Sequence, residues 1–113
     1  MSNLDLDQYI KFFKALASEE RLKMLILLME NQEMVPQNIE KHFFLEQSTT
    51  SHHLNTLRRA GIAKIRKEGR FIYYAIDYDN FRDMLEKFKK DFLSNKKNKY
   101  ISESDNPDKT NRG

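Results

Sequence analysis

The stretch from Gln47 to Gly61, QSTTSHHLNTLRRAG, constrains the fold of this chain more than any other. Thr50, Leu54 and Leu57 recur at intervals of four and three residues, which places them on one face of a helix. Gly61 follows the last turn, where a residue in the left-handed conformation commonly ends a helix. The stretch therefore predicts one helix that packs through a narrow apolar face.

The opposite face of this helix is small, polar and basic, and it carries no carboxylate. A helix built only for solubility usually mixes Glu with Lys. Hydroxyl, imidazole, amide and guanidinium groups suit the phosphates and base edges of DNA. The pattern favours a DNA recognition helix at about 47–60, although an ordinary exposed helix would also fit this stretch. The outward side chains are Ser48, His52, Asn55 and Arg59, flanked by Thr49, Ser51 and Thr56.

Basic residues are concentrated in and just after this helix. The chain has a net charge of +3, but residues 47–70 carry six Lys or Arg against one Glu. Residues 1–46 carry five basic against eight acidic residues, and residues 71–113 carry nine against eight. Such clustering is the electrostatic footprint of a phosphate-binding surface. A solvated basic face is the simpler alternative.

Length and composition exclude several other classes of protein. The 113 residues allow one domain with a modest core, and the absence of Cys excludes disulfides, thiolate metal sites and a Cys redox switch. The start of the chain lacks the basic region of a signal peptide, and the longest apolar run is too short to cross a bilayer. We expect a soluble cytoplasmic protein with no membrane partner. Residues 1–93 would form the domain, and 94–113 a disordered polar tail.

Three helices are predicted before the recognition helix. Residues 4–16 form an apolar helix, and a second helix, capped by Ser18, runs to about Asn31 through the centre of the core. Pro36 opens a short third helix, and a turn joins it to the recognition helix in a helix-turn-helix. The residues expected to be buried in the second helix are Leu22, Leu25, Ile26, Leu28 and Met29, and those of the turn are Phe43, Phe44 and Leu45.

Residues 62–76 contain two runs of β-branched and aromatic residues on either side of Glu68 and Gly69. Such runs predict a two-stranded hairpin. In winged helices, a basic hairpin beside the recognition helix grips the neighbouring minor groove or backbone, although a plain solubilising hairpin fits the alternation equally well. The basic residues near the tip are Lys64, Arg66, Lys67 and Arg70.

The last predicted helix runs from Asp77 to about Leu93 and carries an aromatic stripe at helical spacing. Because the other helices already fill the core, we expect this stripe to pair with the first helix across a two-fold axis. The predicted fold class is therefore mainly α with a small β-hairpin: a winged helix-turn-helix that dimerises through its first and last helices. The expected interface residues are Leu6, Tyr9, Ile10, Phe13, Phe81, Leu85, Phe88 and Phe92.

Two segments, FKALASEERLKMLILL and QSTTSHHLNTLRRAGIAKIRKEGRFIYYAI, resemble the ArsR/SmtB family of winged-helix repressors over about residues 8–92. The resemblance implies a homodimer on an inverted-repeat operator in double-stranded DNA, released by a ligand or redox signal. It also implies that the wing spans Lys64 to Arg70. The residues it places near the major groove are Gln47, Ser48, Thr49, Ser51 and His52.

The sequence departs from this family at the sensing site. Metal-sensing members often carry Cys motifs, which this chain lacks, or an Asp/His set on the last helix. Asp77 and Asp79 match the first half of that set, but Lys90 and Leu93 cannot complete it. A meeting of His42 with His53 is the remaining alternative. We expect no metal site and no cofactor, and an unknown small-molecule inducer stays open.

The hypothesis assigns a role to each group of polar residues. Gln47, Ser51 and His52 would contact bases, so His52→Ala should blur discrimination, whereas Arg66→Ala should weaken binding to all sequences alike. A protein-interaction module is the second hypothesis. An enzyme has little support, because there is no Gly-rich phosphate loop and no assignable catalytic set. The residues expected to bind phosphates are Arg58, Arg59, Lys64, Arg66, Lys67 and Arg70.

Overall fold

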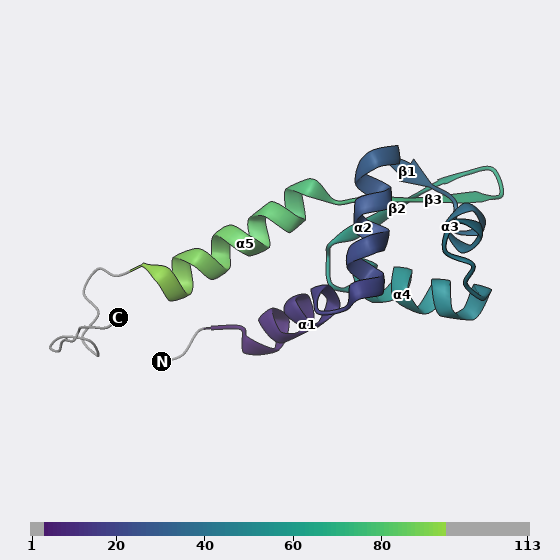
Figure 1. Ribbon diagram of the computed structural model, residues 1–113. Coiled ribbons are helices and arrows are strands. Elements are labelled where there is room, and N and C mark those ends of the chain that lie inside the picture. Colours follow the sequence, from purple (N-terminus) through teal and green to yellow (C-terminus); the bar gives the residue numbers. More distant parts are fainter. Residues whose placement is uncertain (1–3, 95–113) are drawn as a thin grey trace, which may run out of the picture.

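The computed structural model describes residues 4–94, and the predicted tail from residue 95 onward lies outside that range. These residues form five helices and one small sheet (Figure 1). The elements in chain order are α1 (Leu6–Leu16), α2 (Glu19–Asn31), β1 (Glu33–Met34), α3 (Pro36–Phe43), α4 (Gln47–Arg59), β2 (Ala63–Glu68), β3 (Phe71–Ile76) and α5 (Tyr78–Leu93).

Short polar side chains start three of the helices. The side chain of Asp5 accepts a hydrogen bond from the backbone of Gln8 at 3.1 Å, and Asp77 accepts one from Asn80 at 3.2 Å. Ser18 caps α2 in the predicted way, because its hydroxyl accepts from the backbone N–H of Arg21 at 3.3 Å. These caps satisfy N–H groups that have no partner within their own helix.

The sheet has three antiparallel strands in the order β1-β3-β2, so the prediction of a two-stranded hairpin was incomplete. In β2 and β3, Ala63 pairs with Ile76 and Glu68 with Phe71. The added strand places Glu33 opposite Ala75. Two residues are too few to show the alternation that reveals a strand in a sequence. Gly69, at φ +61°, turns the chain between β2 and β3.

The core lies between α1, α2, α3, α4 and one face of the sheet, and α5 adds Met84 to it. It contains Thr50, Leu54 and Leu57, which confirms the predicted apolar face of α4. Leu25 and Leu28 of α2 are buried as expected. The largest fully buried side chains are Phe12, Met24, Leu28, Ile39, Leu54, Leu57, Ile62 and Thr50.

Two predictions of burial were wrong. On α2, Leu22, Ile26 and Met29 are exposed, because only one face of this helix meets the core. Phe44 in the turn after α3 is 94% exposed, since its left-handed backbone directs the ring outward. The neighbouring Leu45 is half-buried against the core.

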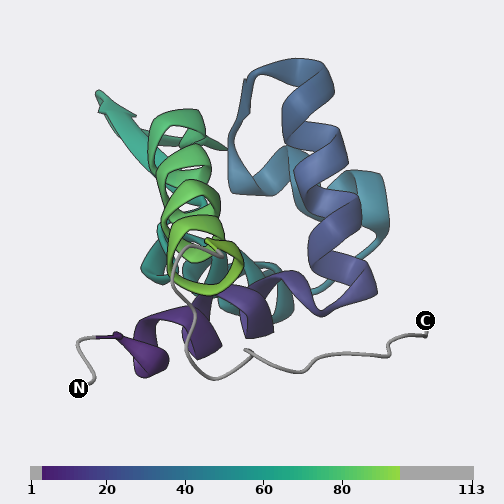
Figure 2. The ribbon, with the colours of Figure 1, turned by 90° about the vertical axis from the view of Figure 1, so that its left-hand side faces the viewer.

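Helices α1 and α5 lie side by side on the opposite side of the domain from the hairpin tip (Figures 1 and 2). Aromatic contacts join the two helices within the chain. The ring of Tyr9 meets that of Phe88 edge-on, with centroids 5.2 Å apart, and Phe13 meets Phe88 at 4.8 Å. The Tyr9 hydroxyl donates to the carboxylate of Asp91. Burial, reinforced by this hydrogen bond, raises the pKa of Tyr9 to about 12.

Candidate nucleic-acid interface

The outer face of α4 is open to solvent. Gln47, Ser48, Thr49 and His52 are exposed, whereas Ser51 is half-buried. The first turn contains no acid, and Glu46 makes no side-chain cap there. The side chain of Glu46 therefore leaves the backbone N–H groups of this turn unoccupied, although its carboxylate stands at the N-cap position. The observed start of α4 at Gln47 agrees with the predicted start of the recognition helix.

The second half of α4 adds amide and basic groups to the same face. Arg58 and Arg59 are exposed, and Asn55 is half-buried. The guanidinium of Arg58 donates to the side-chain oxygen of Asn55 at 3.3 Å. Two residues predicted to contact DNA are therefore hydrogen-bonded to each other. Neither ring nitrogen of His52 forms a hydrogen bond within residues 4–94. The backbone oxygen of His52 accepts one from the hydroxyl of Thr56.

Arg21 fixes α4 relative to α1 and α2. Its guanidinium donates to the carbonyl of Ala15 at 2.8 Å, to that of Lys14 at 3.1 Å, and to Nδ1 of His53 at 3.1 Å. Burial, followed by the charge of Arg21, lowers the pKa of His53, which keeps the ring neutral and able to accept this bond. His53 is therefore hydrogen-bonded to α2 and does not meet His42.

The hairpin of β2 and β3, here called the wing, carries the second basic group. Lys64, Lys67 and Arg70 are exposed on it, as predicted. The guanidinium of Arg70 lies 5.5 Å from the centre of the Phe71 ring. These three cations make no ion pair within residues 4–94, so their charge is available to a ligand.

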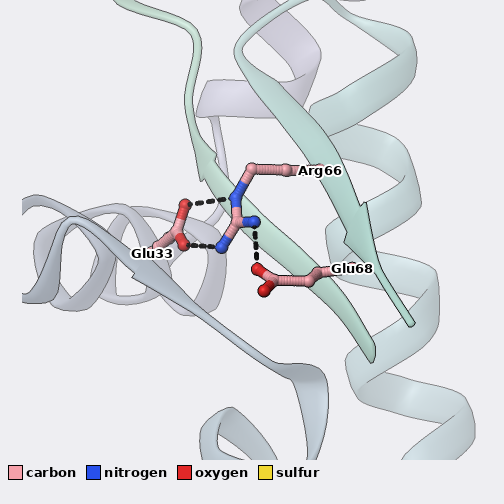
Figure 3. A network of polar contacts seen from close by, with 3 residues as sticks. All are labelled: Glu33, Arg66 and Glu68. Atoms are coloured by element: carbon pink, nitrogen blue, oxygen red, sulfur yellow. Dashed lines mark hydrogen bonds and ion pairs between the residues drawn. The ribbon is translucent and has the colours of Figure 1, made fainter. Parts of the chain in front are cut away.

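Arg66 differs from the other wing cations, because two carboxylates occupy its guanidinium (Figure 3). Glu33 of β1 accepts from Nε at 3.3 Å and from Nη2 at 2.5 Å, and Glu68 accepts from Nη1 at 2.6 Å. The guanidinium also lies 4.5 Å from the centre of the Tyr73 ring. Its hydrogen bond to Glu33, and then that to Glu68, raises the pKa of Arg66, while the same bond lowers the pKa of Glu33.

The candidate sensing residues are engaged in local structure. Asp77 caps α5, and Asp79 forms an ion pair with Arg82 at 3.2 Å. The ring of His42 packs edge-on against Phe43, while His53 is bonded to Arg21. Among the residues that the structure describes, no group of three or more His, Cys, Asp or Glu could hold a metal ion.

A helix-turn-helix followed by a basic wing within a three-stranded sheet defines the winged helix-turn-helix class of DNA-binding domains. The chain belongs to the arsR family of bacterial regulatory proteins, whose family model matches residues 18–64. Proteins of this family are DNA-binding transcription regulators and not enzymes. None of the described helices is both long and apolar enough to cross a membrane.

Individual relatives cover most of the chain. The cadmium resistance transcriptional regulatory protein CadC of Listeria innocua is 32% identical over 97 residues, or 83% of this chain and 82% of that protein. The structure of HlyU from Vibrio cholerae, which is named a transcriptional activator, has a TM-score of 0.61 at 28% identity and covers 81% of this chain and 99% of that one. The homodimeric DNA-binding domain of Mb0332 from Mycobacterium bovis has a TM-score of 0.63 at 29% identity, over 82% and 93%.

Proposed function

We propose that this protein is a transcriptional repressor that binds an inverted-repeat operator as a homodimer. The observation that carries the proposal is the exposed face of α4, which offers only polar and basic groups while Thr50, Leu54 and Leu57 anchor the helix in the core. Each α4 would lie in a major groove, and each wing on the adjacent backbone or minor groove. We propose that a protein with this partner acts in the cytoplasm.

The dimer would form through the apolar sides of α1 and α5. Leu6, Ile10, Leu85 and Phe92 are large, apolar and exposed in the single chain. A hollow of about 440 Å³ lies along α1 and α5, and its walls are almost wholly apolar. The homodimeric state of Mb0332 supports this assembly. Tyr9, Phe13, Phe81 and Phe88 would support the interface from beneath, since they are buried or half-buried within the chain.

The two-fold symmetry would bring two α4 helices into successive major grooves, about 34 Å apart. Gln47, Ser51 and His52 would read base edges. A subunit that neutralises ~3–5 phosphates would lose affinity steeply as salt rises. The side chains proposed to supply this attraction are Arg58, Arg59, Lys64, Lys67 and Arg70, with Ser48, Thr49 and Asn55 completing the surface.

Selection of bound sites from a random DNA pool tests the proposal. We expect a palindrome whose half-sites are one helical turn apart. We expect His52→Ala to keep its affinity for random duplex but to lose about 1–3 kcal/mol of discrimination at one base pair. His42→Ala is the matched control, because His42 is also exposed but lies on α3 against Phe43. An unchanged preference in the His52 variant would disprove its role in base reading.

A mobility shift with the selected operator and with random duplex separates a regulator from a protein-interaction module. The exposed apolar side chains on α2 are what favour the second candidate. Retardation of neither duplex at moderate salt would favour the protein-interaction module.

Repeating the selection with added metals and with a chelator tests whether a metal ion is the signal. A reporter gene behind the operator should be transcribed less when the protein is present, and a rise would make the protein an activator, as HlyU is named.

A further inference from the structure

Glu33, Arg66 and Glu68 form a cluster on the outer face of the sheet, here called the Arg66 clasp (Figure 3). Glu33 lies opposite Ala75 and Arg66 opposite Tyr73, which brings residues 33 positions apart onto one face. Of the six Lys and Arg between residues 47 and 70, only Arg66 forms an ion pair within the described chain. The clasp is therefore a local exception within the basic surface.

The clasp is not needed to hold the wing in place. The side chains of Arg66, Glu33 and Glu68 are 50%, 36% and 70% exposed, and exposed ion pairs contribute little to stability. The backbone already fixes the wing, because β2 pairs with β3 from Ala63 to Glu68 and β3 pairs with β1. The two carboxylates therefore matter more for charge than for the fold.

The charge of the clasp opposes that of its surroundings. One guanidinium and two carboxylates give a local charge of −1 beside Lys64 and Lys67. Three of the five N–H groups of Arg66 donate to carboxylates, so a phosphate could use only the remaining two unless it displaced Glu33 or Glu68. The dependence of affinity on salt reflects how many phosphates the protein neutralises, because each neutralised phosphate releases a counterion from the DNA. Only cations that are free to contact phosphate contribute to this number.

We propose that Glu33 and Glu68 mask Arg66 from the phosphates of DNA and thereby lower the affinity of the wing for DNA of any sequence. This inference rests on the proposed function, since it concerns how tightly the regulator binds DNA. It reverses the expectation that Arg66 is a phosphate contact. In the native protein Arg66 does not contact phosphate, and Glu33 and Glu68 lower the affinity of the wing for DNA. The base-reading face of α4 is unaffected, so the tuning is uniform across sequences.

Titration of operator and random duplexes with Glu33→Gln, Glu68→Gln and the double variant at several salt concentrations tests the mask. Gln keeps a hydrogen-bond acceptor for Arg66 but removes the charge. We expect the double variant to bind both duplexes roughly fivefold to tenfold more tightly at 0.1 M salt. The slope of log affinity against log salt should steepen by about 0.9 as one further phosphate is neutralised.

Arg66→Ala, made in the native protein and in the double variant, separates the effect of the guanidinium on DNA binding from that of the two carboxylates. In the native background we expect the salt slope to stay unchanged, while affinity falls only through repulsion by the two carboxylates that lose their partner. In the Glu33→Gln, Glu68→Gln background the same change should remove the gain in both affinity and slope. Glu19→Gln is the matched control, because it removes one charge from an exposed pair with Lys23, 3.0 Å apart, on α2. It should leave the slope unchanged. Lys64→Ala should flatten the slope by about 0.9 and shows that the assay detects one wing cation.

Either of two results would overturn the mask. One is a double variant that binds random duplex like the native protein. The other is a native-background Arg66→Ala variant whose slope flattens, since Arg66 would then already contact phosphate. Failure of the proposed function looks different, because the native protein itself would then retard no duplex. Circular dichroism and thermal unfolding of each variant show that affinity changes do not come from misfolding.

Discussion

At the scale of single residues, Phe44 stands out because it combines an unfavourable backbone with an unpacked side chain. It ends α3 at φ 57° and ψ 45°, the left-handed conformation in which Gly is ordinary. Such a conformation costs a residue with a side chain about 1–2 kcal/mol. With its ring 94% exposed, Phe44 recovers little of that cost from packing within the chain.

Phe44→Gly should therefore stabilise the domain, by about 1 kcal/mol once the greater freedom of Gly in the unfolded chain is subtracted. Urea unfolding followed by circular dichroism would measure the change. Phe44→Ala is the control, because it removes the ring but keeps the backbone cost. If Ala stabilised the protein as much as Gly does, exposure of the ring and not its backbone would be the cause.

Single residues also show what could be read from the sequence. The exposed polar positions of α4 followed from helical spacing, because the period of a helix fixes which side chains share a face. The partners of His53 and Arg66 did not follow. Arg21 lies 32 residues from His53, and Glu33 lies 33 residues from Arg66. Such pairs depend on how elements pack, which no local pattern contains.

At the scale of elements, the end of α4 is joined directly to the start of α5. The side chain of Asn80 donates to the carbonyl of Gly61 at 2.8 Å, and the backbone of Asp77 donates to Ile62 at 2.8 Å. Gly61 was predicted to end α4, and its φ of +80° agrees. The approach of Asn80 was not predictable, because it needs β2 and β3 to return the chain to this point.

Gly61→Ala should destabilise the domain by about 2 kcal/mol, because it combines positive φ with a collision. A Cβ on Gly61 would lie 2.0 Å from the side-chain nitrogen of Asn80. Gly69→Ala is the matched control: it has φ +61° but nothing within 4 Å of its Cβ, so about 1 kcal/mol is expected. Thermal unfolding measures both losses. Equal losses would mean that Asn80 swings aside without cost and that the contact is weak.

At the scale of the whole molecule, the chain has an apolar side that the monomer leaves uncovered. The sequence correctly indicated that α1 and α5 carry more apolar surface than one core needs. Part of the aromatic stripe on α5 already packs within the chain, since Phe88 contacts Tyr9 and Phe13, which the sequence did not indicate. What is left for a partner is the outer rim of the two helices, which includes Leu6, Ile10 and Phe92.

Ile10→Glu should convert the dimer to a monomer, raising its dissociation constant roughly 100-fold or more, because each interface would bury an unpaired carboxylate. Light scattering after size-exclusion chromatography would report the mass. Ile26→Glu is the matched control, since Ile26 is 50% exposed and Ile10 is 51% exposed, but Ile26 lies on α2. A monomer from Ile26→Glu together with a dimer from Ile10→Glu would move the interface to α2.

The strand order β1-β3-β2 has a consequence for the protein when it is not on DNA. It leaves β2 at the edge of the sheet, with backbone N–H and C=O groups that no neighbouring strand satisfies. Such an edge invites pairing with the edge of another molecule, and Lys or Arg side chains discourage it. The exposed Lys64, Arg66 and Lys67 of β2 therefore protect free molecules from aggregating strand to strand.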